Sequence, residues 1–282
     1  MQNKVWVIIP SYNKHHFLSD AIDSVIAQSY ENFNVIIVND YIDKPNSNDK
    51  CDEIEKLIQD KNDHRIRLIH NNKNLGIPGS RNVAIREFIR INIEYIFFLD
   101  HDDVWIDRDK IKNQLEIMRN QDIWVLWTQF NIVNNGNTII GQSNNPLDYQ
   151  STIDSMLFIT PLLMSTLCIN TSVLEYIGLF NEDYNGSDDK EILIRMLKKY
   201  KWYNMPDVTT NYRYFTDNAS LQKSKELARN NIDIIWKYGK WYNWYYRSLL
   251  LSYLRLLVPF EYKKYFRFLR KYISPLANNM SY

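Results

Sequence analysis

Three carboxylates lie within four residues, directly after a short apolar run, and they are the residues of this chain best suited to chemistry. They are Asp100, Asp102 and Asp103, which follow the run 95–99. Like charges this close repel each other unless a cation or hydrogen-bond donors offset them, and hard divalent cations prefer carboxylate oxygen. The spacing therefore favours a metal-diphosphate site. A purely structural alternative stays open, in which these aspartates cap a helix that we expect to begin after Asp107.

Short β-rich runs alternate with helical patterns in the first half of the chain. The runs cover residues 5–9, 34–38, 65–69 and 95–99, and apolar residues recur at helical spacing between them. Such alternation predicts a largely parallel sheet with right-handed crossovers, in which ligands bind beyond the carboxyl ends of the strands. Three segments are therefore predicted to share one rim of the sheet: Pro10-Ser11-Tyr12, Asn39-Asp40 and Asp100 to Asp103.

The second half of the chain has a different pattern. Residues 124–133 and 138–140, separated by Asn and Gly, predict a hairpin, and residues 190–200 predict a helix. Asp188 and Asp189 stand at the start of this helix, where the helix dipole alone would favour one of them. Two or three amphipathic helices are expected after residue 220. We therefore expect a main domain over residues 1–220 and a helical extension over residues 221–282.

Composition is that of an ordinary globular protein. The 282 residues include 45% hydrophobic and 24% charged residues, with a net charge of +1. Only seven glycines occur, and no glycine-rich phosphate-binding motif is present. Cys51 and Cys168 are outside any paired spacing, and no signal peptide is evident at the N-terminus. These features predict a reduced, cytoplasmic protein, and nothing in them indicates a nucleic-acid partner.

The C-terminal extension differs in charge from the rest of the chain. Residues 221–282 carry twelve Lys or Arg and three Asp or Glu, whereas residues 1–220 have a net charge of −8. The extension also holds 15 of the 40 aromatic residues, a combination suited to the headgroups of an anionic membrane. We expect peripheral attachment at the inner face of the cell membrane through residues 221–272. In the alternative, these aromatics pack onto the body of the protein.

Six short motifs lie within roughly residues 4–220. They are Val7 to Asn13, Val38-Asn39-Asp40, Asn74 to Asn82, Phe98 to Asp103, Gly178-Leu179-Phe180 and Asp188-Asp189. Their order and spacing resemble those of the family 2 glycosyltransferases, inverting enzymes that use nucleotide-activated sugars. The resemblance implies an α/β, Rossmann-like GT-A fold with a mainly parallel central sheet, followed here by a helical tail.

The resemblance also implies roles for residues on the nucleotide side. Pro10 and Tyr12 would line the nucleotide pocket, Asp40 would accept a hydrogen bond from the base, and Arg81 would lie beside the nucleotide. In the less favoured alternative, Tyr12 is an ordinary loop aromatic and Arg81 is part of a helix-surface ion pair.

The implied catalytic residues are acids. Asp100 would approach the ribose or the metal, and Asp102 would coordinate a divalent metal, Mn²⁺ or Mg²⁺. Asp189 would be the general base, the second acid of the family's acid pair. Asp103 has no clear role, and His101 is expected to point away from the site because extended residues alternate in direction.

Three positions depart from the family pattern. Asn39-Asp40-Tyr41-Ile42 keeps the second acid of the usual Asp-Asp-Gly-Ser and loses its glycine, and Asp188 replaces a glutamate. Phe215 stands where many relatives carry a histidine that can approach the metal, so a weaker or differently completed metal site is expected.

The function expected from the sequence is inverting transfer of a sugar from a nucleotide-sugar, commonly a UDP-sugar, to a glycan or glycolipid acceptor in bacterial surface-polysaccharide synthesis. A second hypothesis is a degenerate relative that binds nucleotide or glycan without turnover as part of an assembly complex. Asp40, Asp102 and Asp189 together disfavour it, whereas Phe215 mildly favours it. A nucleotidyltransferase is a weaker third hypothesis, because Asp188-Asp189 and the motif 178–180 fit it poorly.

Overall fold

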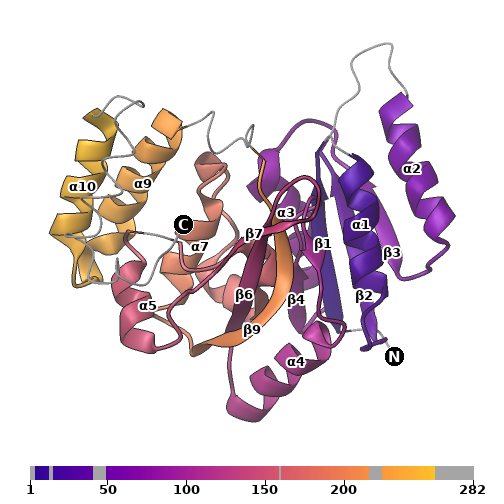
Figure 1. Cartoon of the computed structure of the whole chain (residues 1–282), viewed down its shortest axis with the longest axis horizontal. Coiled ribbons are helices and arrows are strands. Elements are labelled where there is room, and N and C mark those ends of the chain that lie inside the picture. The colour runs from indigo at the N-terminus through magenta and orange to yellow at the C-terminus, as the bar shows by residue number, and fades with distance from the viewer. Residues whose placement is uncertain (1–3, 13–14, 41–48, 159, 216–223, 258–282) are drawn as a thin grey trace.

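The computed structural model describes residues 4–12, 15–40, 49–158, 160–215 and 224–257 (Figure 1). Nine strands form one sheet within these residues, in the order β3-β2-β1-β4-β8-β6-β9-β5, with β7 paired to β6. The strands are β1 (Val5–Ser11), β2 (Phe33–Asn39), β3 (Ile66–His70), β4 (Tyr95–Phe98), β5 (Val104–Trp105), β6 (Val125–Val133), β7 (Ile139–Gln142), β8 (Cys168–Asn170) and β9 (Trp202–Arg213).

The first four strands confirm the predicted βαβ half. β1 pairs in parallel with β2 and β4, and β2 pairs in parallel with β3. The other half of the sheet is mixed, because β8 runs antiparallel to both β4 and β6 while β9 runs parallel to β6. The predicted hairpin is also confirmed as the antiparallel pair β6–β7. The sheet thus changes strand direction at β8, beside the strand that ends at the aspartates.

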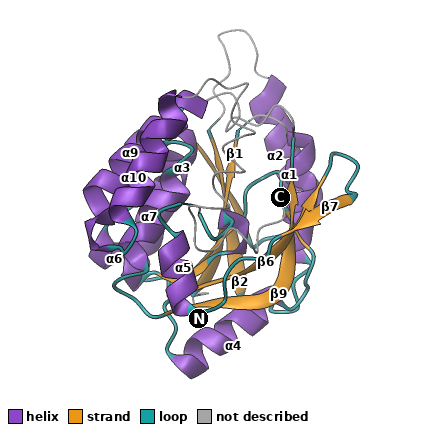
Figure 2. Cartoon of the chain, turned by 60° about the vertical axis from the view of Figure 1, so that its left-hand side comes forward, coloured by secondary structure: helices purple, strands orange, loops and turns teal. Residues whose placement is uncertain are grey.

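Helices cover both faces of this sheet. Figure 2 shows α6, α7, α9 and α10 on one side of the strands and α1 and α2 on the other. The helices are α1 (His15–Ile26), α2 (Asp49–Lys61), α3 (Gly76–Arg90), α4 (Lys110–Gln121), α5 (Tyr149–Ser155), α6 (Ser172–Ile177), α7 (Asp188–Met196), α9 (Ser224–Tyr238) and α10 (Tyr245–Leu257), with short 3-10 helices η1 (Met164–Thr166), η2 (Glu182–Tyr184) and η3 (Gly239–Trp241).

Alternation along the central strands produces two hydrophobic cores. Successive side chains of a strand point to opposite faces. In β1, Trp6 and Ile8 therefore join one core with α3, α7, α9 and α10, whereas Val5, Val7 and Ile9 join the other with α1, α2 and α4. Because both faces are covered, β1 is buried along its whole length. The first exposed residue beyond its carboxyl end is Tyr12.

The C-terminal helices complete one of these cores. Ile234 and Ile235 of α9 and Leu249 and Leu251 of α10 are buried in the core that also contains Leu193 of α7. Packing onto the body therefore accounts for part of the apolar composition of the extension. In the described part of the chain, no helix combines the length and the apolarity that crossing a bilayer requires.

We predict that a chain ending at residue 220 does not fold stably. Truncation would expose side chains whose burial contributes about 1.5–3 kcal/mol each, which in sum is comparable to the stability of a whole domain. Thermal unfolding followed by near-UV circular dichroism should show no cooperative transition for this truncation. A chain ending at Leu257 keeps α9 and α10 and serves as the control. An unchanged cooperative transition in the shorter chain would contradict the prediction.

Candidate active site

The carboxyl ends of β1, β2 and β4 bring the predicted rim residues together. Ser11 is paired with Asn39 at the ends of β1 and β2, and Ile8 is paired with Phe98 near the end of β4. Tyr12, half-exposed, and Asp100 follow these strand ends, whereas Pro10 is buried within β1.

Asp40 organises the loop that leads into α3. Its buried carboxylate accepts hydrogen bonds from the backbone N–H of Leu75 and of Gly76 and from the side-chain amide of Asn71, each at 2.8 Å. Gly76 has a φ of +71°, a conformation that favours glycine. The implied hydrogen bond that Asp40 would accept from a nucleotide base stays a prediction. Tyr41 and Ile42, where the sequence departs from the family pattern, lie outside the described residues.

Arg81 joins the two acidic parts of the site. Its guanidinium Nη2 lies 2.6 Å from Oδ1 of Asp100, and Nη1 lies 2.5 Å from Oδ2 of Asp188. The Arg81 side chain is buried, so these ion pairs form away from bulk water. The alternative of an ion pair for Arg81 is therefore correct as to the ion pair, but the pair is buried and not on the helix surface. Its contact with a nucleotide stays a prediction.

Asp103 stabilises the acidic loop from within. Its buried carboxylate accepts hydrogen bonds from the hydroxyl of Ser165 at 2.5 Å and from the backbone N–H of Arg213 at 3.1 Å. Burial, together with the nearby Asp102 and Asp100 carboxylates, raises the pKa of Asp103 well above its usual value. These contacts give Asp103 a structural role, although not the helix-capping role considered from the sequence.

Asp100 and Asp102 are the acids of this loop with partial exposure. Mg²⁺ is typically bound in proteins by one or two carboxylates together with substrate phosphates, and two partly exposed carboxylates fit that donor set. Within the described ranges, no group of three or more His, Cys, Asp or Glu side chains could hold a metal by itself. Phe215 is buried against Phe17, with ring centroids 5.1 Å apart, and offers no metal ligand.

Asp189 lies in the first turn of α7, next to the ion-paired Asp188. It is half-buried, and its Oδ1 accepts a hydrogen bond from the backbone N–H of Lys190 at 2.6 Å. Burial and the adjacent Asp188 carboxylate raise the pKa of Asp189 to about 6. A carboxylate with a pKa near the working pH is suited to accept a proton.

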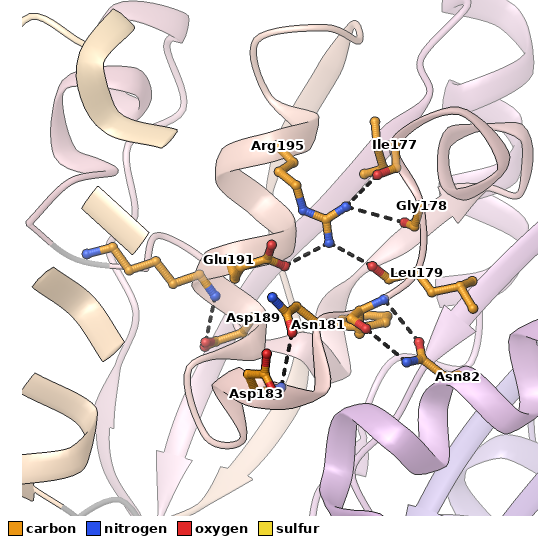
Figure 3. Close-up of polar contacts among 11 residues, drawn as sticks. Asn82, Ile177, Gly178, Leu179, Asn181, Asp183, Asp189, Glu191 and Arg195 are labelled. Atoms are coloured by element: carbon orange, nitrogen blue, oxygen red, sulfur yellow. Dashed lines mark hydrogen bonds and ion pairs between the residues drawn. The ribbon is translucent and has the colours of Figure 1, made fainter. Parts of the chain in front are cut away.

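Arg195 fixes α7 to the loop before it (Figure 3). Its guanidinium donates to the carbonyls of Ile177 at 2.7 Å and Leu179 at 2.8 Å, and to the carboxylate of Glu191 at 2.7 Å. Gly178, between the two carbonyls, has a φ of +85°. Arg195, six residues after Asp189, thus contacts the segment that contains the motif 178–180. This contact positions the helix.

Asn82 connects this loop to α3. Its amide donates to the carbonyl of Phe180 at 2.9 Å and accepts from the backbone N–H of Phe180 at 3.0 Å. Asn82 is adjacent to Arg81 in the sequence, so two consecutive residues of α3 bind the loop before α7, at Phe180, and the first residue of α7, at Asp188. The position of Asp189 therefore depends on α3 as well as on its own helix.

Sequence reasoning missed two residues of the site, Ser165 and Arg213. The hydroxyl of Ser165 also accepts a hydrogen bond from the backbone N–H of Asp100 at 3.0 Å. Arg213 ends β9, where its guanidinium pairs with Asp20 of α1 at 2.5 Å and donates to the carbonyl of Asp102 at 3.2 Å. Ser165 belongs to no periodic pattern or motif identified in the sequence. Arg213 lies two residues before Phe215, in a segment considered only for its missing histidine, so neither residue was marked as part of the site.

The Rossmann-like sheet, the acids at its rim and the adjacent helix that carries Asp188 and Asp189 are the arrangement expected of a glycosyltransferase of the GT-A fold. The chain belongs to the family described as "Glycosyl transferase family 2", whose model matches residues 6–177. Both the resemblance and the α/β fold expected from the sequence are thereby confirmed.

Solved structures share this fold. S. aureus TarS residues 1–349, in complex with UDP-GlcNAc, aligns with a TM-score of 0.64 and 17% identity over 95% of this chain and 80% of that one. The mannosyltransferase PcManGT from Pyrobaculum calidifontis, in complex with GDP-Man and Mn²⁺, aligns with a TM-score of 0.62 and 14% identity over 99% of this chain and 74% of that one.

Two bacterial relatives are similar over most of their length. Escherichia coli WfgD, a "UDP-Glc:alpha-D-GlcNAc-diphosphoundecaprenol beta-1,3-glucosyltransferase", is 28% identical over 80% of this chain and 83% of its own. The putative teichuronic acid biosynthesis glycosyltransferase TuaG of Bacillus subtilis is 29% identical over 80% of this chain and 84% of its own. The relatives thus include glycosyltransferases of bacterial polysaccharide and glycolipid synthesis.

We predict that Arg81→Met costs about 3–5 kcal/mol of folding free energy, because it leaves the buried Asp188 carboxylate without its cation. Arg86→Met on the same helix is the matched control. Arg86 forms an exposed pair with Glu182 at 3.5 Å, so its loss should cost at most about 1 kcal/mol. Urea unfolding of both variants measures the difference. An equal loss of folding free energy in the two variants would show that the buried ion pair of Arg81 with Asp188 is not important for stability.

Proposed function

We propose that this protein is an inverting, metal-dependent glycosyltransferase that moves a sugar from a UDP-sugar to a glycan or lipid-linked glycan in bacterial surface-polysaccharide synthesis. The observation that carries the proposal is the buried Arg81, which ties Asp100 on the rim to the acid pair Asp188-Asp189. WfgD, whose name gives UDP-Glc as donor and a lipid diphosphate-linked sugar as acceptor, supports the donor and acceptor classes.

Asp189 is the proposed general base. In a single displacement, an acceptor hydroxyl attacks the anomeric carbon from the face opposite the departing nucleoside diphosphate, so its proton must be accepted on the acceptor side. A carboxylate with a pKa of about 6 is mostly ionised at neutral pH and is still basic enough to receive that proton. The hydrogen bond from Lys190 N–H holds one of its oxygens in place.

Asp100 and Asp102 are the proposed holders of the divalent metal. When bound, such a cation stabilises the negative charge that develops on the leaving diphosphate. Arg81 keeps Asp100 oriented through one carboxylate oxygen, Oδ1. Ser165 hydrogen-bonds the backbone of Asp100, and Arg213 hydrogen-bonds the backbone of Asp102. The loop that carries both carboxylates is therefore held in place.

The alternative function is binding of nucleotide or glycan without turnover. Phe215, an apolar residue where many relatives place a possible metal ligand, favours it. The raised pKa of Asp189 favours catalysis, since a site that only binds has no need of a base tuned to about 6.

Nucleotide release tests the proposal directly. The full chain is incubated with UDP-, GDP- and TDP-sugars, with and without Mn²⁺ or Mg²⁺. The first measurement has no added acceptor, so that water is the acceptor, and the second adds lipid-linked or free glycan acceptors. We expect metal-dependent UDP release that increases when the right acceptor is added. Tight binding of a nucleotide-sugar without release under any of these conditions would favour the non-catalytic alternative.

We predict that Asp189→Asn lowers kcat by about 10²–10⁴, because the amide cannot accept the proton, while the affinity for the donor stays nearly unchanged. Asp183→Asn is the control, since Asp183 is an exposed acid on the neighbouring η2. Loss of donor affinity in place of rate would assign Asp189 to binding.

The proposed role of Asp189 as general base also predicts how kcat/KM depends on pH. Below pH 6 the Asp189 carboxylate becomes protonated and inactive, so kcat/KM should be full above this pH and fall about tenfold per unit below it. Asp189→Asn should lose this acidic limb. A limb that persists in the variant would belong to another group.

We predict that Asp102→Ala removes turnover and most metal-dependent nucleotide binding without unfolding the protein. Asp100→Ala should resemble it, whereas Asp103→Ala should act mainly by lowering stability, because it breaks the bonds to Ser165 and Arg213. Isothermal titration of UDP with and without Mn²⁺ separates these effects. Asp207→Ala, an exposed acid on β9, is the control. Metal-dependent binding that survives in Asp102→Ala would overturn the metal assignment.

The proposed location is the cytoplasm, with peripheral attachment to the inner face of the cell membrane. A lipid-linked acceptor would be reached there without the chain crossing the bilayer.

A further inference from the structure

The outward face of α10 is apolar. Tyr246 is 83% exposed and Leu250 is 61% exposed, and Tyr253 and Leu254 continue this face at helical spacing. A helix that packs with one face on a core normally presents charged and polar residues on the other. The apolar outward face of α10 therefore needs an explanation beyond folding.

A second exposed aromatic group lies at the connection between α9 and α10. Trp236 is 57% exposed and Trp241 is 81% exposed. The ammonium of Lys240 lies 5.8 Å from the centroid of the Trp236 ring. α9 and α10 pack side by side, at the end of the molecule remote from α2 (Figure 1). We call these exposed residues of α9, η3 and α10 the outer helical surface.

Charge on the outer helical surface is mainly basic. Its exposed charged residues in the described range 224–257 are Lys225, Arg229, Lys237, Lys240 and Arg247 against Glu226 and Asp233. Lysine is depleted at the core of protein interfaces, and two copies of a basic surface repel each other. Trp and Tyr mixed with Lys and Arg are typical of surfaces that lie in lipid headgroups.

We propose that the outer helical surface docks on an anionic lipid bilayer, with Trp236, Trp241, Tyr246 and Leu250 in the headgroup region and Lys237, Lys240 and Arg247 on the lipid phosphates. This proposal goes beyond glycosyl transfer, and it names the residues through which the protein meets the membrane.

The outer helical surface is joined firmly to the helix that carries Asp189. Lys190, the next residue, donates to the side-chain oxygen of Asn231 in α9, and Asn231 donates to Ser252 of α10 at 2.7 Å. Tyr184, just before α7, donates to Asp233 of α9. Docking would therefore orient the active site relative to the membrane surface. This last step rests on the proposed function, because it matters only for a lipid-linked acceptor.

The test is co-sedimentation of the full chain with phosphatidylcholine vesicles that contain or lack phosphatidylglycerol. A charge variant replaces Lys237, Lys240 and Arg247 by Gln, and an aromatic variant replaces Trp236, Trp241 and Tyr246 by Ser. Each basic residue near an anionic surface is worth about fivefold in partitioning, so the charge variant should bind on the order of a hundredfold more weakly. The aromatic variant should bind weakly to both kinds of vesicle.

Matched controls lie elsewhere on the surface. Lys56, Arg90 and Lys112, all exposed and replaced together by Gln, remove the same charge, and Tyr176→Ser removes an exposed tyrosine from α6. Both controls should bind anionic vesicles like the unaltered chain. Thermal unfolding confirms that each variant is folded.

Three results would overturn the proposal: no binding of the full chain to anionic vesicles at low salt, unchanged binding of the charge variant, or equal loss in the matched control. Self-association abolished by the aromatic variant, without any vesicle binding, would instead make this surface an interface between copies. Release of UDP from a UDP-sugar, with water as the acceptor, is measured on the same proteins. It tests the proposed function separately, because no altered residue lies in the active site.

Discussion

A single buried guanidinium, that of Arg81, holds the two acidic parts of the active site together. Asp100 follows β4, and Asp188 begins α7 on a different segment of the chain. Both acids approach one region of low polarity, where their mutual repulsion and the loss of hydration would be costly without a cation between them. The packing of α7 against the sheet therefore depends on a residue of α3 that contacts both.

Sharing one cation also affects the pKa of Asp189, the proposed base. Burial and Asp188 raise the pKa of Asp189, while the hydrogen bond from Lys190 N–H and the charges of Arg81 and Lys190 lower it. Because Arg81 also pairs with Asp100, its charge only partly offsets the acid pair. A dedicated cation beside Asp189 would hold its pKa lower and make it a weaker base. The ion pairs of Arg81 thus connect Asp100, a proposed metal ligand, to the proposed proton acceptor.

The first half of the fold could be predicted from the sequence because periodicity and chain direction determine it. Buried strands separated by helical patterns require parallel pairing, and the rim residues follow from that pairing alone. The second half could not be predicted in detail, since β8 has only three residues and shows no pattern of its own. Ser165 and Arg213 join segments far apart in the chain, and local sequence does not show such partners. Asn82 and Phe180 belong to two motifs identified in the sequence, but nothing local showed that the two motifs contact each other.

The composition of the C-terminal extension left packing and membrane attachment as alternatives, and its helical periodicity explains why the two are compatible. In α10, Leu249 faces the core while Leu250 faces outward, because adjacent residues of a helix lie about 100° apart. An apolar segment can therefore complete a core with one face and keep a second apolar face outside. The hydrophobic core continues across residue 220, so the change in composition there does not mark an end of packing. Within the described residues 224–257, many outward side chains are apolar or basic, whereas packing alone would be satisfied by any polar face.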